Sequence, residues 1–302
     1  MKTYYSNGKL LITGEYLVLD GALSLALPTI YGQSLTVNPI KLSKLLWKSI
    51  DCNNEIWFEN ELSLDEISKG LSTTHDDVSN KLIQILNTAQ QLNPDFLNLK
   101  SGFEVTTKLD FPKNWGLGSS STLINNIANW ANVDAYKLLE LTFGGSGYDI
   151  ACAQYNSAIT YQLKDKKPLV NSVAFKPEFK DNLYFVFLNQ KQNSRDAIAH
   201  YKTNKSNTEV AINEINYITT QMMSCKTIDE FSLLIDKHET IISKTIHQKT
   251  VKEQLFNDFK GSIKSLGAWG GDFVLAACEE NPVDYFKNKG YQTVIRYSKM
   301  IL

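Results

Sequence analysis

Residues 114–122, Asn-Trp-Gly-Leu-Gly-Ser-Ser-Ser-Thr, constrain this chain most, because two glycines two apart lead directly into a helical pattern. Apolar residues recur at helical spacing from Leu123 to Trp130. The first N–H groups of a helix lack partners within the helix, and the helix dipole adds partial positive charge there. A glycine turn at that end predicts an anion site, whose hydroxyl groups can bind phosphate or Mg²⁺.

An ordinary structural interpretation competes with this one, because serine-capped helices that follow loops are common. The stretch is not a Walker A loop, since no lysine follows the glycines, and it lacks the third glycine of a dinucleotide fingerprint. The choice therefore depends on the surrounding chain.

The flanking segments supply the context of a phosphate loop. Residues 103–109 alternate as a half-buried strand before the turn, and Asp134 caps a second helix that ends near Thr142. A glycine cluster at 144–147 then delivers Asp149 to the start of a short helix. An acid there is often only a cap and dipole partner. The functional alternative is a general base beside the phosphate loop.

The rest of the chain mixes strand and helix patterns. Residues 264–272 form a second glycine-rich loop, whose three glycines in five residues suggest close approach to a ligand or to another backbone. The polar stretch 164–168 is a candidate linker, and its charge run is typical of a solvated turn. The expected strands are 9–13, 34–37, 56–58, 157–163, 183–188, 273–277 and 291–297, and the expected helices are 76–92, 208–223, 228–235, 239–259 and 282–287.

Composition excludes several function classes. The 302 residues carry a net charge of −1, which gives no sign of a nucleic-acid or membrane-surface partner. No stretch is long and apolar enough to cross a bilayer, and no signal peptide is evident. The four cysteines are scattered without a CxxC pair, and the four histidines form no zinc pattern. We therefore expect a cytoplasmic protein, and the sequence does not decide between a monomer and a homodimer.

Three stretches together carry a family resemblance. Residues 8–16 (GKLLITGEY), 116–121 (GLGSSS) and 267–272 (GAWGGD) resemble the three motifs of the GHMP kinases, in the same order and across nearly the whole chain. Residues 145–151 (GSGYDIA), with 158–161, resemble the mevalonate and phosphomevalonate kinase branch and a bacterial GYDIA-type subgroup. The resemblance implies an α+β fold of two domains. Residues 1–165 would form a strand-rich ATP-binding domain, and residues 166–302 a ferredoxin-like sandwich.

The same resemblance implies an ATP- and Mg²⁺-dependent kinase of a small-molecule hydroxyl or phosphate, with mevalonate or phosphomevalonate favoured. Asp149 matches the acid that takes the acceptor's proton, and Lys9 the lysine that offsets developing charge. Ser120 matches the Mg²⁺ ligand, and Glu140 is the nearest candidate for an acidic one. The expected ATP cradle is Trp115, Gly116, Leu117, Gly118, Ser119, Ser120 and Ser121. The expected acceptor contacts are Glu15, Tyr16, Ser146, Gly147, Arg195, Gly270 and Gly271.

Departures from the family pattern keep alternatives open. Trp115 and Trp269 stand where the family usually has small residues, and they could narrow the nucleotide or acceptor pocket. Tyr16 replaces a histidine common in mevalonate kinases. The alternatives are a diphosphomevalonate decarboxylase, a sugar or amino-acid kinase, and a non-catalytic ligand-binding protein of the same fold. The sequence does not identify the acceptor.

Overall fold

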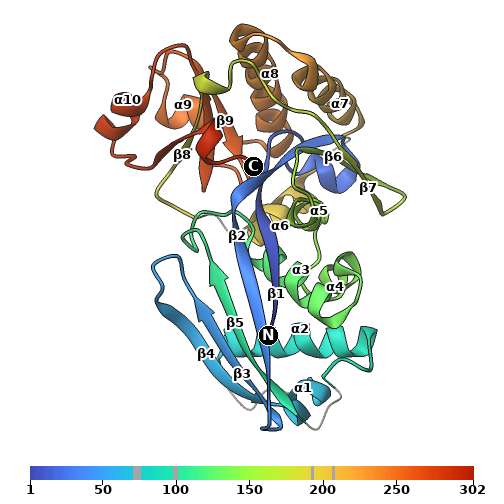
Figure 1. Ribbon diagram of the computed structural model, residues 1–302. Coiled ribbons are helices and arrows are strands. Elements are labelled where there is room, and N and C mark those ends of the chain that lie inside the picture. The colour runs from blue at the N-terminus through green and yellow to red at the C-terminus, as the bar shows by residue number, and fades with distance from the viewer. Residues whose placement is uncertain (71–75, 98–100, 192–193, 206–207) are drawn as a thin grey trace. The chain divides into compact units, whose positions relative to one another are not determined.

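The computed structural model describes residues 1–302 except 71–75, 98–100, 192–193 and 206–207 (Figure 1). Contacts divide the chain into two compact units that interleave along the sequence. Unit 1 comprises residues 1–8, 31–113 and 118–154, and unit 2 comprises residues 9–30, 114–117 and 155–302. Two strands, β1 (Lys2–Leu11) and β2 (Ser24–Ile40), contribute to both units.

Unit 1 is a sheet covered by helices. Besides its share of β1 and β2, its strands are β3 (Lys44–Ile50), β4 (Ile56–Ser63) and β5 (Gly102–Leu109). Strand β5 pairs in parallel with β3 and antiparallel with β2, and β4 pairs antiparallel with β3. The helices of unit 1 are α1 (Leu64–Lys69), α2 (Asp77–Leu92), α3 (Ser119–Ala131), α4 (Ala135–Thr142) and α5 (Tyr148–Gln154).

Local signals explain where the helices of unit 1 begin. The Asp76 carboxylate caps α2 through Ser79 N, and the Asp134 carboxylate caps α4 through Tyr136 N. Buried residues alternate along β3 and β5, so one face of these strands joins the apolar core that the helices cover (Figure 1). This core holds α3 in place.

Unit 2 contains a four-stranded antiparallel sheet. The strands of the unit are β6 (Ile159–Lys164), β7 (Lys167–Ser172), β8 (Leu183–Phe187), β9 (Ser262–Leu266), β10 (Phe273–Ala277) and β11 (Val294–Arg296). The four-stranded sheet has the order β11-β8-β10-β9. Numbered from β8 onward, these strands lie in the order 4-1-3-2, which is the expected ferredoxin-like arrangement. The helices of unit 2 are α6 (Ser194–Asn204), α7 (Glu209–Ser224), α8 (Ile228–Ile246), α9 (Val251–Leu255) and α10 (Val283–Asn288).

The linker prediction for residues 164–168 is wrong. These residues close a tight hairpin, because β7 pairs antiparallel with β6 and Lys164 lies opposite Lys167. The two residues between them, Asp165 and Lys166, both have positive φ, as a two-residue hairpin turn of this hand requires. Both strands belong to unit 2. The domain bounds 1–165 and 166–302 stay a prediction, which contact clusters alone do not decide.

Most of the other expected elements are present with shifted ends. The two helices expected at 228–235 and 239–259 are instead α8, which is continuous, and the short α9. The first strand starts seven residues earlier than expected, at Lys2, and ends at Leu11. The sequence analysis missed β3, β7, β9, α1 and α6, and residues 264–266, which it assigned to the late glycine loop, belong to β9. Within the described residues, no helix has the length and apolar character needed to span a membrane.

Candidate active site

Helix α3 begins directly after the glycine turn, as predicted. Its N-cap is Gly118, in the left-handed conformation at φ 89°, and no side chain caps the helix by a hydrogen bond. The serine-capped interpretation is therefore wrong for this helix. Ser120 is exposed in the first turn, whereas Ser121 is 3% exposed. The first turn of α3 has the properties of an anion site, with uncapped N–H groups and an exposed hydroxyl.

The predicted base contacts this helix. Asp149 lies in the first turn of α5, and its Oδ2 accepts a hydrogen bond from Ser121 Oγ at 2.5 Å. Asp149 is only partly buried. Ser146 and Gly147 precede it, and Gly147 has φ 86°. The geometry within unit 1 thus joins the predicted base to the first turn of α3.

A buried polar network, which sequence analysis missed, fixes the two helices. Asn125 and Asn126 are 2% and 0% exposed on α3. Ser6 Oγ donates to Asn126 Oδ1 at 2.8 Å, and Asn125 Nδ2 donates to Ser6 Oγ at 2.9 Å. Gln154 Nε2 on α5 donates to Asn125 Oδ1 at 2.9 Å. Each bond satisfies a buried polar group, so together they hold α5, and with it Asp149, against α3.

In unit 2, the first-motif lysine holds the glycine turn. Lys9 Nζ donates to Gly116 O at 3.0 Å, and Lys9 N donates to Leu117 O at 3.0 Å. Gly116 has φ 66°, and a Cβ placed there would lie 2.3 Å from the Asp272 carboxyl carbon. The side chain of Asp272, at the end of the late loop, therefore lies directly against Gly116. This contact requires a glycine in the central loop, and the close approach predicted for the glycines of the late loop stays a prediction.

That late loop connects β9 and β10, which are antiparallel neighbours. Gly270 has φ 80° with nothing within 4 Å of an added Cβ, and its carbonyl accepts from Gln190 Nε2 at 2.5 Å. Gly271 is buried, and its N–H donates to Ala268 O at 3.2 Å. Whether these two glycines contact an acceptor stays a prediction.

The two tryptophans lie against protein side chains. Trp115 packs edge-on against Phe273, with ring centroids 5.4 Å apart. Trp269 is 5% exposed, and its Nε1 donates to Lys249 O at 2.9 Å. Its backbone N–H donates to Tyr16 Oη at 3.0 Å, which ties the late loop to the first motif. Their predicted effect on a ligand pocket is untested.

The first-motif glutamate lies in a buried ionic cluster. Glu15 is 2% exposed and contacts Lys264 and His238, while Lys264 also lies 3.2 Å from Glu239. Burial raises the pKa of Glu15 to about 7, and the charge on Lys264 opposes this shift. Sequence analysis did not single out Lys264, His238 or Glu239. His238 and Glu239 lie within the helix α8 with no distinguishing motif, and Lys264 was assigned to the late glycine loop rather than to a buried strand.

The structure does not test the predicted roles of Glu140 and Arg195. Glu140 is exposed on α4, and its carboxylate pairs with Lys137 Nζ at 2.8 Å. Arg195 belongs to α6, but its side chain lies outside the described residues. Among the described residues, no three His, Cys, Asp or Glu side chains form a group that could hold a metal ion. The roles of Glu140 and Arg195 stay predictions.

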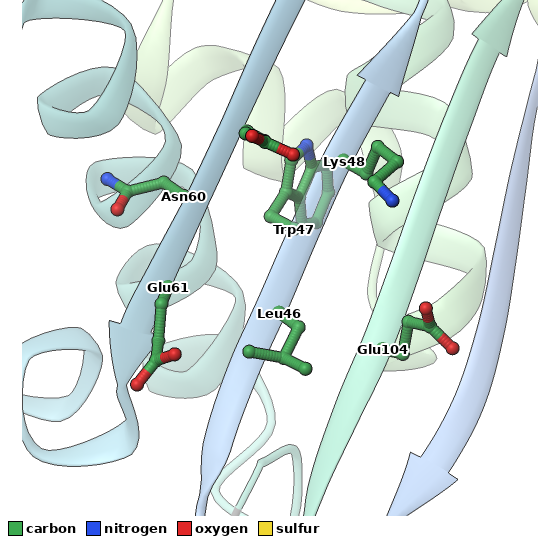
Figure 2. Close-up of a pocket in the computed structure, with 7 residues that line it drawn as sticks. Leu46, Trp47, Lys48, Asn60, Glu61 and Glu104 are labelled. Atoms are coloured by element: carbon green, nitrogen blue, oxygen red, sulfur yellow. The ribbon is translucent and has the colours of Figure 1, made fainter. Parts of the chain in front are cut away.

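A separate pocket of about 380 Å³ lies on the open face of the sheet of unit 1. Figure 2 shows that its side chains come from β3, β4 and β5. Glu61 within it pairs with Lys44 Nζ at 2.5 Å. It contains none of the predicted site residues, and its lining residues are Leu46, Trp47, Lys48, Glu59, Asn60, Glu61 and Glu104.

Comparisons with known proteins identify the fold. No family model and no curated protein matches the chain. Among solved structures, the Methanococcus jannaschii mevalonate kinase aligns with a TM-score of 0.72 at 18% identity, covering 97% of this chain and 96% of that one. The Streptococcus pneumoniae phosphomevalonate kinase, in complex with phosphomevalonate and AMPPNP, aligns with a TM-score of 0.72 at 15% identity, covering 98% and 100%. The Lactococcus lactis galactokinase, complexed with galactose, aligns with a TM-score of 0.64 at 14% identity, covering 95% and 88%.

Proposed function

We propose that this chain, which has the two-domain GHMP kinase fold, transfers the γ-phosphoryl group of ATP to a small molecule. The observation that carries the proposal is the hydrogen bond between Ser121 and Asp149. It places a carboxylate beside the first turn of α3, whose N–H groups have no side-chain cap and suit a phosphate group. A helix start that only capped a loop would need no such acid.

The chain's own residues suit the steps of phosphoryl transfer. Asp149 accepts the proton of the attacking group, and Lys9 offsets the negative charge that develops on it. The uncapped N–H groups of α3 bind the phosphates, and the bond from Lys9 Nζ to Gly116 O fixes the glycine turn that precedes them. Such positioning and charge stabilisation account for most of the catalysis in this reaction class.

A Mg²⁺ ion fits the same helix start. Mg²⁺ in kinases is usually held by one or two protein oxygens together with phosphates and water. The exposed Ser120 hydroxyl provides one such oxygen in the first turn of α3. A Mg²⁺ ion held there would neutralise negative charge on the phosphates. Glu140 as an additional ligand remains part of the proposal, although its carboxylate pairs with Lys137 in this structure.

For the acceptor, we propose mevalonate or phosphomevalonate, on the resemblance of residues 145–151 and the two mevalonate-route relatives. A sugar is the second candidate, because the galactokinase shares the fold. The proposed acceptor contacts are Tyr16, Ser146, Gly147, Arg195, Gly270 and Gly271. Glu15, which the sequence also suggested, is 2% exposed and paired with Lys264, so we propose that it serves the acceptor only through the turn next to it.

The test is ADP release from Mg-ATP with a panel of mevalonate, phosphomevalonate, diphosphomevalonate, galactose and homoserine. Turnover with one of the first two supports the proposal, and phosphate release with carbon dioxide from diphosphomevalonate indicates the decarboxylase instead. If no acceptor is turned over, calorimetry with a non-hydrolysable ATP analogue distinguishes a wrong choice of acceptor from the absence of nucleotide binding. An inactive protein that binds the analogue excludes the tested acceptors, whereas a folded protein that binds none argues against a kinase.

A further inference from the structure

Four ionisable side chains in unit 2 are buried together, and the proposed reaction uses none of them as acid or base. Glu15 comes from the first motif, His238 and Glu239 from α8, and Lys264 from β9. Their exposed fractions are 2%, 0%, 3% and 0%. Buried charges must be balanced, because an uncompensated charge in the protein interior is strongly unfavourable.

The charge balance calls for one additional proton. Lys264 Nζ contacts Glu15 Oε1 and lies 3.2 Å from Glu239 Oε1. Two ionised carboxylates and one ammonium group would leave a net negative charge. Ser265 Oγ donates to Glu239 Oε2 at 2.9 Å, which favours the ionised form of Glu239. Glu15 is therefore the carboxyl group on which a proton is better placed.

The surroundings of His238 locate that proton. The Gly14 N–H donates to His238 Nε2 at 3.0 Å, so Nε2 is an acceptor and carries no hydrogen. Glu15 Oε2 lies 3.3 Å from the same nitrogen, and within the described structure it has no hydrogen-bond partner. Two bare acceptors would repel each other. A proton on Oε2 instead makes the 3.3 Å contact one arm of a three-centre hydrogen bond, in which the single lone pair of Nε2 accepts from both Oε2–H and the Gly14 N–H.

The other protonation states conflict with the geometry. A hydrogen on Nε2, in imidazolium or in the other neutral tautomer, would point at the Gly14 N–H. Burial and the nearby charge of Lys264 also lower the pKa of His238 well below its ordinary value. The neutral imidazole then carries its hydrogen on Nδ1, which faces Glu239 Oε1 at 3.9 Å.

We infer that Glu15 is a neutral carboxylic acid that keeps its proton on Oε2, donates a hydrogen bond to His238 Nε2 and thereby positions the turn formed by Gly14 and Tyr16. That turn is strained, because Tyr16 adopts φ 62° and ψ −48°. The Tyr16 Oη accepts a hydrogen bond from Trp269 N at 3.0 Å, so Tyr16 is fixed by the late loop and Gly14 by His238. Glu15 is a positioning residue, which acts through the backbone next to it.

The pH dependence of stability tests this assignment. The unfolded glutamate has a pKa of 4.5 and the folded one about 7. The folded protein keeps a proton that the unfolded chain releases, so stability falls as the pH rises from 4.5 towards 7, then levels off. One such proton changes the unfolding equilibrium constant by roughly tenfold per pH unit. Burial also raises the pKa of Glu239, although Lys264 and Ser265 oppose this.

Urea unfolding of the full chain across this range gives the first readout. Glu15→Gln keeps an acceptor for Lys264 and a donor for His238, so it should lose the tenfold-per-unit decline and match wild type near pH 5. Glu178→Gln, at an exposed position of unit 2, should keep the decline. If Glu15→Gln keeps it and Glu239→Gln loses it, the proton belongs to Glu239 and the inference is overturned.

A second readout uses the wild-type protein, so it does not depend on a variant that folds. Nitrogen-15 NMR of histidine-labelled protein should show His238 neutral, with the hydrogen on Nδ1, at pH values below 6.5, the ordinary pKa of histidine. If His238 keeps its hydrogen on Nδ1 in Glu15→Gln, whose amide can still donate a hydrogen bond, but not in Glu15→Ala, the result supports Glu15 as the hydrogen-bond donor to Nε2. A hydrogen on Nε2 in wild type contradicts it.

Discussion

The Ser121 hydroxyl donates a hydrogen bond to Asp149 Oδ2 across 2.5 Å. This contact joins the first turn of α3 to the first turn of α5, although the two residues are 28 positions apart. The hydrogen bond therefore brings together two motifs that are separate in the sequence: the serine-rich start of α3 and the aspartate that follows the glycine cluster. The first two predictions below concern this pair.

Asp149→Asn should lower turnover by about 100- to 10,000-fold, the range expected for loss of a general base. The asparagine carbonyl can still accept from Ser121, so the thermal midpoint should stay within a few degrees of wild type. Steady-state kinetics with the acceptor identified in the panel, together with a thermal melt, provide the measurement. Turnover close to wild type would remove Asp149 from the mechanism.

Ser121→Ala should lower kcat roughly 10- to 100-fold, because small errors in the position of a reacting group carry such costs. KM for ATP should change little if the hydroxyl acts mainly on Asp149. The double variant with Asp149→Asn gives the control. Residues that act as a unit are non-additive, so Ser121→Ala should cost little further turnover in that background. Full additivity would show that the two residues act independently.

Gly116→Ala should destabilise unit 2 and weaken ATP binding. The left-handed φ of 66° strains any other residue by about 1–3 kcal/mol, and the new Cβ would also collide with the Asp272 carboxyl group. Gly270→Ala is the matched control, since its φ is 80° but its Cβ meets nothing within 4 Å. Urea unfolding should show the larger loss for Gly116→Ala. If the two variants lose the same free energy of unfolding, the Asp272 side chain moves away from the new Cβ without destabilising the protein, and the steric argument is wrong.

Lys264→Met should destabilise the protein by about 3–5 kcal/mol, because removing one partner of a buried ion pair leaves an uncompensated charge. Adding Glu239→Gln to it should recover part of this loss by removing the remaining charge. Chemical denaturation at neutral pH measures both. The exposed pair of Lys69 and Asp65 provides the control, and Lys69→Met should have a small effect. An equally small effect of Lys264→Met would argue against a buried ion pair.

Local sequence signals were sufficient for several elements that position the site. The caps Asp76 and Asp134 act on neighbouring N–H groups, and the start of α3 after Gly118 depends on residues adjacent in the chain. Continuous apolar runs likewise located β8 and β10. Two other features lack such local signals. The charged stretch 164–168 was mistaken for a linker, because the pairing of β6 with β7 does not follow from the local sequence. Strand β3 was missed, because it is defined mainly by its pairing with β4 and β5.

The sequence by itself determined the order of the three glycine motifs, the helix that follows the central one and the delivery of Asp149 to a helix start. These follow from residues close together in the chain, where turn geometry and capping act. Only the tertiary structure decided which of the three serines contacts Asp149, since each step along a helix turns the side chain by about 100° and leaves Ser120 exposed but Ser121 buried. It also decided that Glu15 is buried with Lys264, 249 residues away. Burial and long-range contact depend on how the whole chain packs, and no local pattern encodes them.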